Sequence, residues 1–436
     1  MRKYFIHTMG CQMNEYDSLR IASVFEKMGF APAEEMEDGD YLIVNTCSVR
    51  EKPQHKAESA IGRFKQLKKK RPNEVKIGFC GCVAQQEGEN LLKSNKEIDF
   101  VVGTDGLHRL EEVISHVEAG ERLSDTMVND GGLEIDLFSR EVSVSSFVTI
   151  MKGCDNFCSY CIVPYVRGRE KSREIHEIMD EVKYLADNGA REVTLLGQNV
   201  NSYGTTLADS IGFPELLNKV TEVEGIKRVR FVTSHPKDFS DGLIEVMRDN
   251  DKICEYLHLP LQAGSNDVLK KMNRKYTYEH YYERVMKAKE MIPDLALSSD
   301  FIVGFPGETD EDFQATMKAL EEIRYDMIYA FNYSTRPGTK AENFDDDVPL
   351  NTKKARLAKL LDAQKKIIAE NSAQYQDKIV EVMVEGSAKK DDNQFSGRNR
   401  QNRVVNFTSD SILTTGDFVK VKITEPRPNS LLGVRV

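Results

Sequence analysis

The sequence predicts an α/β protein in three parts: an open α/β sheet domain, a partial (β/α)6 barrel and a small all-β barrel at the C-terminus. Strand-like and helix-like segments alternate in two separate stretches, and only short β-rich runs follow them. The 436 residues are enough for about two to four domains. We place the domains at 1–120, 141–372 and 373–436, with a linker at 121–140.

The first 120 residues have the pattern of an open sheet with helices between its strands. The predicted strands are 3–8, 41–45, 75–79 and 100–102, and the predicted helices are 15–28, 56–70 and 107–119. Polar, irregular sequence follows, with a turn signal at Asn129-Asp130-Gly131-Gly132. This stretch is the predicted linker.

Strand and helix patterns alternate again in the middle of the chain. The predicted strands are 147–151, 192–196, 229–233, 254–260, 296–303 and 327–333. Six strand-helix units are too few for a complete eight-unit barrel, so we expect a partial barrel that is open along one side. A long polar helix, 352–373, leads out of it.

The last 60 or so residues contain four short β-rich runs, at 379–384, 403–407, 418–423 and 431–436. Asp391-Asp392-Asn393, Thr415-Gly416-Asp417 and Pro426-Arg427-Pro428 separate them as expected turns. This pattern predicts a small all-β barrel.

Composition limits the classes of function. The net charge of −10 argues against a protein that coats nucleic acid by bulk charge, although residues 48–76 hold ten basic and three acidic side chains. That basic zone is either a polyanion contact or a solvated helix face. The chain shows neither a membrane-spanning apolar run nor a signal peptide, so we expect a cytoplasmic protein without a membrane partner. Its eight cysteines then favour metal or thiol chemistry over disulfides.

The strongest motif is the run Cys154-x3-Cys158-x2-Cys161, directly after a predicted strand. Three closely spaced thiolates can hold three irons of a cubane cluster and leave the fourth iron open. Structural zinc is an alternative, but it normally needs a fourth ligand, and no other Cys or His is near in the sequence. Three unrelated core cysteines are the remaining alternative.

A second set of cysteines follows three predicted strands of the N-terminal sheet. Cys11, Cys47 and Cys82 each come just beyond a strand, and the carboxyl ends of parallel strands share one edge. They could hold a second cluster with one open iron, although buried core cysteines would give the same pattern. Cys80 is a possible substitute ligand, and Cys254 is expected in a core.

The Cys154-x3-Cys158-x2-Cys161 run resembles the signature of the radical S-adenosylmethionine (SAM) enzymes. That resemblance implies a [4Fe-4S] cluster whose open iron binds SAM and cleaves it to a 5′-deoxyadenosyl radical. Residues 10–18, 45–52, 81–88 and 153–170 extend the likeness to the methylthiotransferases. Ser48-Val49-Arg50 favours the MiaB branch, the tRNA-2-methylthio-N6-dimethylallyladenosine synthases, and the C-terminal segment is similar to the RNA-binding TRAM domain.

The resemblance implies replacement of C–H by C–S–CH3 at carbon 2 of N6-(dimethylallyl)adenosine, at position 37 of tRNA. Two SAM and one sulfur atom are consumed. One cluster, on Cys154, Cys158 and Cys161, forms the radical, and an auxiliary cluster on Cys11, Cys47 and Cys82 delivers the methylated sulfur. The expected partners are a tRNA anticodon stem-loop and an electron donor such as flavodoxin or ferredoxin, and we expect a monomer.

Fold logic also suggests where SAM and RNA bind. Polar or flexible residues at the strand ends of the middle domain are candidates for SAM: Gln198, Asn199, Gln262, Asp300, Gly304 and Gly307. Basic residues beside the radical motif and on the small barrel could pair with phosphates: Arg167, Arg169, Lys171, Arg173, Arg398, Arg400 and Arg403.

Other classes of function stay open at this level. A related enzyme could act on N6-threonylcarbamoyladenosine in tRNA or on a ribosomal protein side chain. A non-catalytic iron-sulfur protein that binds RNA would also carry these cysteines.

Overall fold

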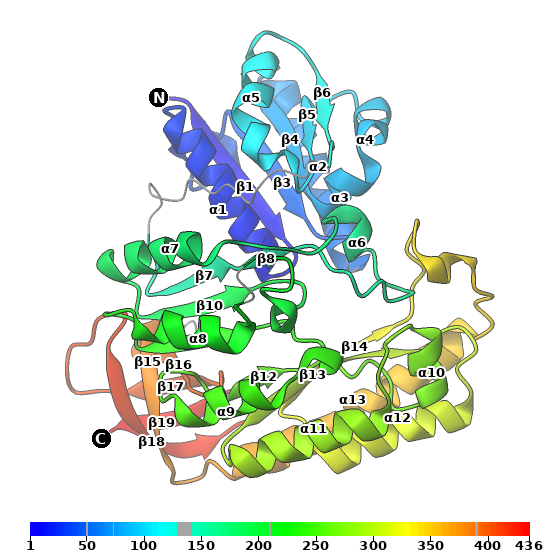
Figure 1. The fold of residues 1–436 in the computed structure, drawn as a ribbon. Coiled ribbons are helices and arrows are strands. Elements are labelled where there is room, and N and C mark those ends of the chain that lie inside the picture. Colours follow the sequence, from blue (N-terminus) through cyan, green and yellow to red (C-terminus); the bar gives the residue numbers. More distant parts are fainter. Residues whose placement is uncertain (49–50, 73, 129–141, 209–210, 389–390) are drawn as a thin grey trace.

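The computed structural model describes the chain except residues 49–50, 73, 129–141, 209–210 and 389–390 (Figure 1). It confirms the three predicted parts. No helix in the described part of the chain has the length and apolar character needed to cross a membrane. The turn predicted at 129–132 lies outside the described residues.

The N-terminal domain is one parallel sheet with the strand order β2-β1-β3-β4-β5-β6. Its strands are β1 (Lys3–Met9), β2 (Ala31–Pro32), β3 (Tyr41–Thr46), β4 (Lys76–Gly81), β5 (Phe100–Val102) and β6 (Leu123–Asp125). Its helices are α1 (Gln12–Lys27), α2 (Glu51–Lys70), α3 (Cys82–Glu87), α4 (Glu89–Ser94) and α5 (Leu110–Glu118). Apolar side chains of the central strands are buried in two cores, as expected for a sheet covered on both faces.

The boundary that we predicted at residue 120 is wrong. Strand β6 lies inside the predicted linker, yet it pairs in parallel with β5 and completes the sheet. Its sequence, Leu-Ser-Asp, is too short and too polar to show a period of two. The pairing with β5 decides its structure instead.

The middle domain contains all six predicted strands. They are β7 (Ser145–Thr149), β10 (Glu192–Leu196), β11 (Arg228–Phe231), β12 (Tyr256–His258), β13 (Ala296–Val303) and β14 (Met327–Asn332). They form two parallel sheets, β11-β10-β7 and β12-β13-β14, which a bridge between Val229 and Ile253 connects. No pairing of described residues joins β7 to β14, so the barrel is partial, as predicted.

Helices surround this partial barrel, and the two strands of a short hairpin lie before and after the first of them. The helices are α6 (Val163–Val166), α7 (Ile175–Asp187), α8 (Phe213–Glu222), α9 (Asp241–Asp249), α10 (Asn266–Lys271), α11 (Tyr278–Met291), α12 (Asp310–Ile323) and α13 (Leu350–Ala373). The hairpin pairs β8 (Met151–Lys152) with β9 (Lys171–Ser172). The apolar faces of helices α7 to α13 and of the six parallel strands share the largest core among the described residues.

The C-terminal domain is a closed barrel with the strand order β15-β16-β17-β19-β18. The strands are β15 (Ile379–Ala388), β16 (Asp391–Asn399), β17 (Val404–Thr408), β18 (Phe418–Pro426) and β19 (Leu431–Arg435). We predicted a turn at 391–393, but strand β16 begins there. Asp and Asn favour turns locally, whereas the long pairing of β16 with β15 extends the strand over them.

The two smaller domains contact opposite ends of the middle domain. The N-terminal domain packs where the parallel strands end, since Met13 and Tyr16 of α1 contact Leu196, the last residue of β10. The C-terminal barrel binds where they begin: Arg228 opens β11 and donates to the carbonyl of Arg398. Figure 1 shows the two domains on different sides of the middle domain. Only the N-terminal domain therefore borders the edge where ligands of such barrels bind.

Candidate active site

Cys11, Cys47 and Cys82, here the N-terminal triad, come together at the carboxyl edge of the N-terminal sheet. Cys11 caps α1 after β1, Cys47 directly follows β3, and Cys82 begins α3 after β4. The thiol of Cys47 is within hydrogen-bonding contact of the other two. Gly10 permits this approach, because a Cβ there would lie 2.7 Å from the Cβ of Cys47.

The triad favours thiolates, the form that binds metals. Hydrogen bonding from Cys47 and the charge of Arg167 lower the pKa of Cys11 to about 6. The same two influences lower the pKa of Cys82 to about 7. The pKa of Cys47 is raised, because its thiol is the donor to both neighbours. Cys80 lies within the buried core of the sheet, where burial raises its pKa, so it is not a member of the triad.

Cys154, Cys158 and Cys161, here the middle triad, lie on the loop between β8 and α6. The side chain of Asn156 donates to the sulfur of Cys154 at 3.3 Å, and Arg274 donates to the sulfur of Cys158 at 3.3 Å. These contacts suit sulfurs that carry negative charge. The triad therefore has the donors that an iron-sulfur cluster needs around its ligands.

Each triad offers three thiols rather than a site for one metal ion. Among the residues that the structure describes, no three His, Cys, Asp or Glu side chains are arranged to hold a single ion. A cubane cluster makes a different demand, because each thiolate binds a different iron. Three contributed thiols and buried hydrogen-bond donors fit that demand at both triads.

The two triads lie on the same interface between domains. Cys82 packs against Ile162, which directly follows Cys161, and against Val166 of α6. Cys11 packs against a small cluster that contains Leu196 at the end of β10, and Val232, just after β11, packs against the same cluster. The hydroxyl of Thr104 also donates to the carbonyl of Val166 across this interface.

Unpaired polar atoms mark the neighbouring strand ends of the middle domain. Gln198, Asn199, Ser234, His235, Asp300 and Asn332 each have a buried side-chain atom without a hydrogen-bond partner. Buried polar atoms are normally satisfied, so this concentration indicates a polar ligand. Gln262, another predicted residue, has an uncommon φ of +74° and pairs its backbone with Asp300 and Ile302.

We predicted Gly304 and Gly307 as glycines that allow a cofactor to approach the backbone, and the structure gives each of them a further constraint. A Cβ at Gly304 would lie 2.3 Å from the side chain of Lys353, and one at Gly307 would lie 2.4 Å from the Lys271 ammonium. Both residues also have positive φ. The positive φ is what favours glycine at both positions, and Gly304 and Gly307 stay predicted contacts for SAM.

Arg274, which no sequence motif singles out, is buried beside the middle triad. Besides Cys158, its guanidinium donates to the Tyr276 hydroxyl at 2.8 Å and to the Pro260 carbonyl at 3.0 Å. It lies more than a hundred residues after the cysteine motif, between α10 and α11. Only folding brings Arg274 to the loop that carries the middle triad.

Four of the seven predicted RNA contacts are wrong, because these arginines have partners within the protein. Arg167 and Arg173 are buried and bind Asp17 and Glu181, at 2.7 and 2.6 Å. An arginine paired in this way is not free to meet a phosphate. Arg169 and Arg398 also have partners, Asp155 and Glu385, but their side chains are 75% and 39% exposed, so both remain candidates together with Lys171.

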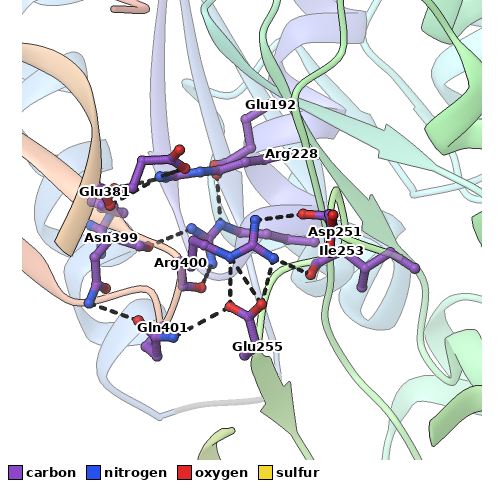
Figure 2. Close-up of polar contacts among 11 residues, drawn as sticks. Glu192, Arg228, Asp251, Ile253, Glu255, Glu381, Asn399, Arg400 and Gln401 are labelled. Carbon is purple, nitrogen blue, oxygen red and sulfur yellow. Dashed lines mark hydrogen bonds and ion pairs between the residues drawn. The ribbon is translucent and has the colours of Figure 1, made fainter. Parts of the chain in front are cut away.

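The other two corrected residues, Arg400 and Arg403, fasten the C-terminal barrel to the middle domain, and Figure 2 shows the contacts of Arg400. Arg400 makes a two-nitrogen contact with Glu255 at 2.6 and 2.7 Å and donates to the carbonyls of Asp251 and Ile253. Arg228 of β11 donates in the other direction, to the carbonyl of Arg398 and to the carboxylate of Glu381. Arg403 likewise donates to Asp326 and Ser372.

Replacing Arg400 by alanine is expected to weaken this docking. The change removes charge-assisted hydrogen bonds and leaves two carbonyls unpaired, which should cost on the order of 2 kcal/mol. Urea unfolding should show a lower midpoint. The matched control is Arg427→Ala, whose partner Glu425 is exposed on the same barrel, and it should change stability by less than about 0.5 kcal/mol. Equal midpoints for the two variants would contradict the docking role.

Comparison with known families agrees with this architecture. The model of the uncharacterized protein family UPF0004 matches residues 3–103, that of the radical SAM superfamily matches 148–320, and that of the TRAM domain matches 373–436. A radical SAM methyltransferase from Kitasatospora setae, TsrM, has the same fold over 78% of this chain and 74% of its own. Its TM-score is 0.57 at 15% identity. Fold and cysteine pattern thus define a radical SAM protein with a TRAM domain.

Full-length relatives give the particular family. The tRNA-2-methylthio-N(6)-dimethylallyladenosine synthase of Clostridioides difficile is 47% identical, over 99% of this chain and 91% of its own. That of Geotalea uraniireducens is 46% identical over 98% of both chains. The chain belongs to the family of tRNA-2-methylthio-N6-dimethylallyladenosine synthases.

Proposed function

We propose that this protein methylthiolates carbon 2 of N6-(dimethylallyl)adenosine at position 37 of tRNA. The observation that carries the proposal is the contact between Cys82 of one triad and Ile162, the neighbour of Cys161 in the other. A radical made at one site then arises next to sulfur held at the other. The names of the full-length relatives support the same reaction.

The enzyme uses SAM and two [4Fe-4S] clusters. Bound there, these groups supply a 5′-deoxyadenosyl radical, which breaks an unreactive aromatic C–H bond, and a methylated sulfur. In our proposal Cys154, Cys158 and Cys161 hold the radical cluster. Cys11, Cys47 and Cys82 hold the auxiliary cluster.

The other residues of the site bind and orient SAM. The unpaired polar atoms of Gln198, Asn199 and Asp300 lie where SAM would present its polar groups, and Gln262 pairs with Asp300 beside them. Four of the six cysteines are buried, and Cys11 and Cys161 are half-buried, which limits the access of water to a reactive radical. The residues thus provide positioning and exclusion of water, and the cofactors provide the chemistry.

The proposal includes an RNA contact through Arg169, Lys171 and Arg398. The Arg169 side chain is 75% exposed and lies beside the middle triad, where a splayed base would enter. A low-potential donor of the flavodoxin or ferredoxin kind would reduce the radical cluster. We assign the reaction to a monomer in the cytoplasm, the compartment of tRNA and of reduced thiols.

Arg398→Ala is expected to weaken tRNA binding and to reduce the slope of log K against log salt by about one phosphate contact. Its side chain is 39% exposed, and its partners are Glu385 at 3.3 Å and the carbonyl of Asn402 at 3.2 Å. Filter binding at several salt concentrations measures both quantities. Lys420→Ala, an exposed change elsewhere on the barrel, is the control, and equal slopes for the two variants would remove Arg398 from the RNA site.

The function is tested with reconstituted protein, SAM, reductant and three tRNA substrates. One carries N6-(dimethylallyl)adenosine, one carries N6-threonylcarbamoyladenosine and one carries unmodified adenosine at position 37. We expect the 2-methylthio nucleoside only from the first. Product from the second alone would place the protein in another branch of methylthiotransferases, and 5′-deoxyadenosine without a modified nucleoside from any tRNA would contradict tRNA as the substrate.

A further inference from the structure

Arg167 is a residue of the middle domain whose charge is buried in the site of the N-terminal domain. It is 7% exposed, and its guanidinium donates to the carboxylate of Asp17 at 2.7 Å. Asp17 lies on α1, six residues after Cys11. The pair therefore crosses the domain interface beside the N-terminal triad.

The backbone around Arg167 is tied to both triads. Ile162 and Val166, just before it, pack against Cys82. Gly168, just after it, accepts a hydrogen bond from the backbone N–H of Cys154 at 3.3 Å. A displacement of Arg167 would thus disturb one cysteine of each triad.

The charge of Arg167 is held beside the N-terminal triad. Its partner Asp17 lies on the helix that Cys11 caps, and its chain neighbour Val166 packs against Cys82. Arg167 and Cys82 are buried, so the interaction of this charge with a cluster on the triad would be only weakly screened. Arg274 occupies the corresponding position at the middle triad, where it donates to Cys158. Each triad thus has one buried arginine.

We propose that Arg167 is a positioning residue that ties the auxiliary cluster site to the radical-cluster loop and supplies the fixed positive charge that sets the reduction potential of the auxiliary cluster. A positive charge stabilises the reduced, more negative state, so it raises that potential. The inference rests on the proposed function, because it assigns a cluster to Cys11, Cys47 and Cys82. It replaces the role in RNA binding that the sequence suggested for Arg167.

The test uses protein with Cys154, Cys158 and Cys161 all replaced by alanine, so that only the auxiliary cluster forms. Its reduction potential is measured by a titration followed by electron paramagnetic resonance. Adding Arg167→Met should shift the potential to more negative values, and Arg167→Lys should recover most of that shift. Adding Asp17→Asn should shift it the opposite way, because a negative charge is lost while Arg167 stays. Arg427→Met removes an exposed charge on the C-terminal barrel and should leave the potential unchanged.

The opposite signs separate an electrostatic role from a merely structural one. Shifts in the same direction for Arg167→Met and Asp17→Asn, or no shift in either, would overturn the proposal. Iron content and the urea midpoint show whether each variant is folded and loaded. If Arg167→Met does not fold, Asp17→Asn and Arg167→Lys still decide the sign. Failure of the triple-alanine parent to bind four irons would instead refute the auxiliary site.

Discussion

Replacing Cys158 by alanine should reduce the formation of 5′-deoxyadenosine from SAM to the level seen without enzyme. The change removes one of three thiolates that the radical cluster needs and leaves the Arg274 guanidinium without its sulfur partner. No methylthiolated nucleoside should form either. The N-terminal triad is untouched, so the auxiliary cluster should remain.

The measurement is chromatography of the reaction after reconstitution, together with the iron content per chain. The iron content should fall by half relative to the parent. Cys254→Ala is the matched control, because this cysteine is also buried in the middle domain and belongs to neither triad. A Cys158→Ala variant that still forms 5′-deoxyadenosine would refute the role of the middle triad.

Replacing Cys47 by alanine should separate the two halves of the reaction. Its thiol contacts those of both Cys11 and Cys82, so its loss removes the centre of the N-terminal triad. The auxiliary cluster should be lost, and with it all 2-methylthio product. Cleavage of SAM to 5′-deoxyadenosine should continue, because the middle triad keeps its three thiols.

Both products are quantified in one reaction with tRNA that carries N6-(dimethylallyl)adenosine. Cys80→Ala serves as the control, since Cys80 lies two residues before Cys82 but within the sheet core. It should keep the auxiliary cluster at a stability cost on the order of 1 kcal/mol. Loss of the cluster in Cys80→Ala, with retention in Cys47→Ala, would show that Cys80 is the ligand instead.

Much of the fold could be predicted because burial imposes a period on the sequence. All six strands of the partial barrel and four of the N-terminal strands were found in this way. The two-residue strands β2, β8 and β9 were not predicted, and neither were β6 and β16, whose local sequences favour loops and which only pairing with β5 and β15 extends. Long-range pairing of this kind leaves no local signal.

Some features of the site could likewise be predicted from the sequence, and others could not. The positions of Cys11, Cys47 and Cys82 after three strands predicted that they meet, because parallel strands end at one edge. The partners of the arginines could not be predicted, since Arg167 and Asp17 lie 150 residues apart. Arg400 and Arg403 carry the charge expected of an RNA contact, yet the folded chain uses them to dock a domain.

The activity that these residues serve is the formation of the 2-methylthio nucleoside in tRNA. The most direct test is mass spectrometry of nucleosides from total tRNA of a strain without the gene, beside its parent. Our account predicts that 2-methylthio-N6-(dimethylallyl)adenosine disappears and N6-(dimethylallyl)adenosine accumulates, and that the intact gene restores the parent pattern. An unchanged level of the 2-methylthio nucleoside would contradict the account.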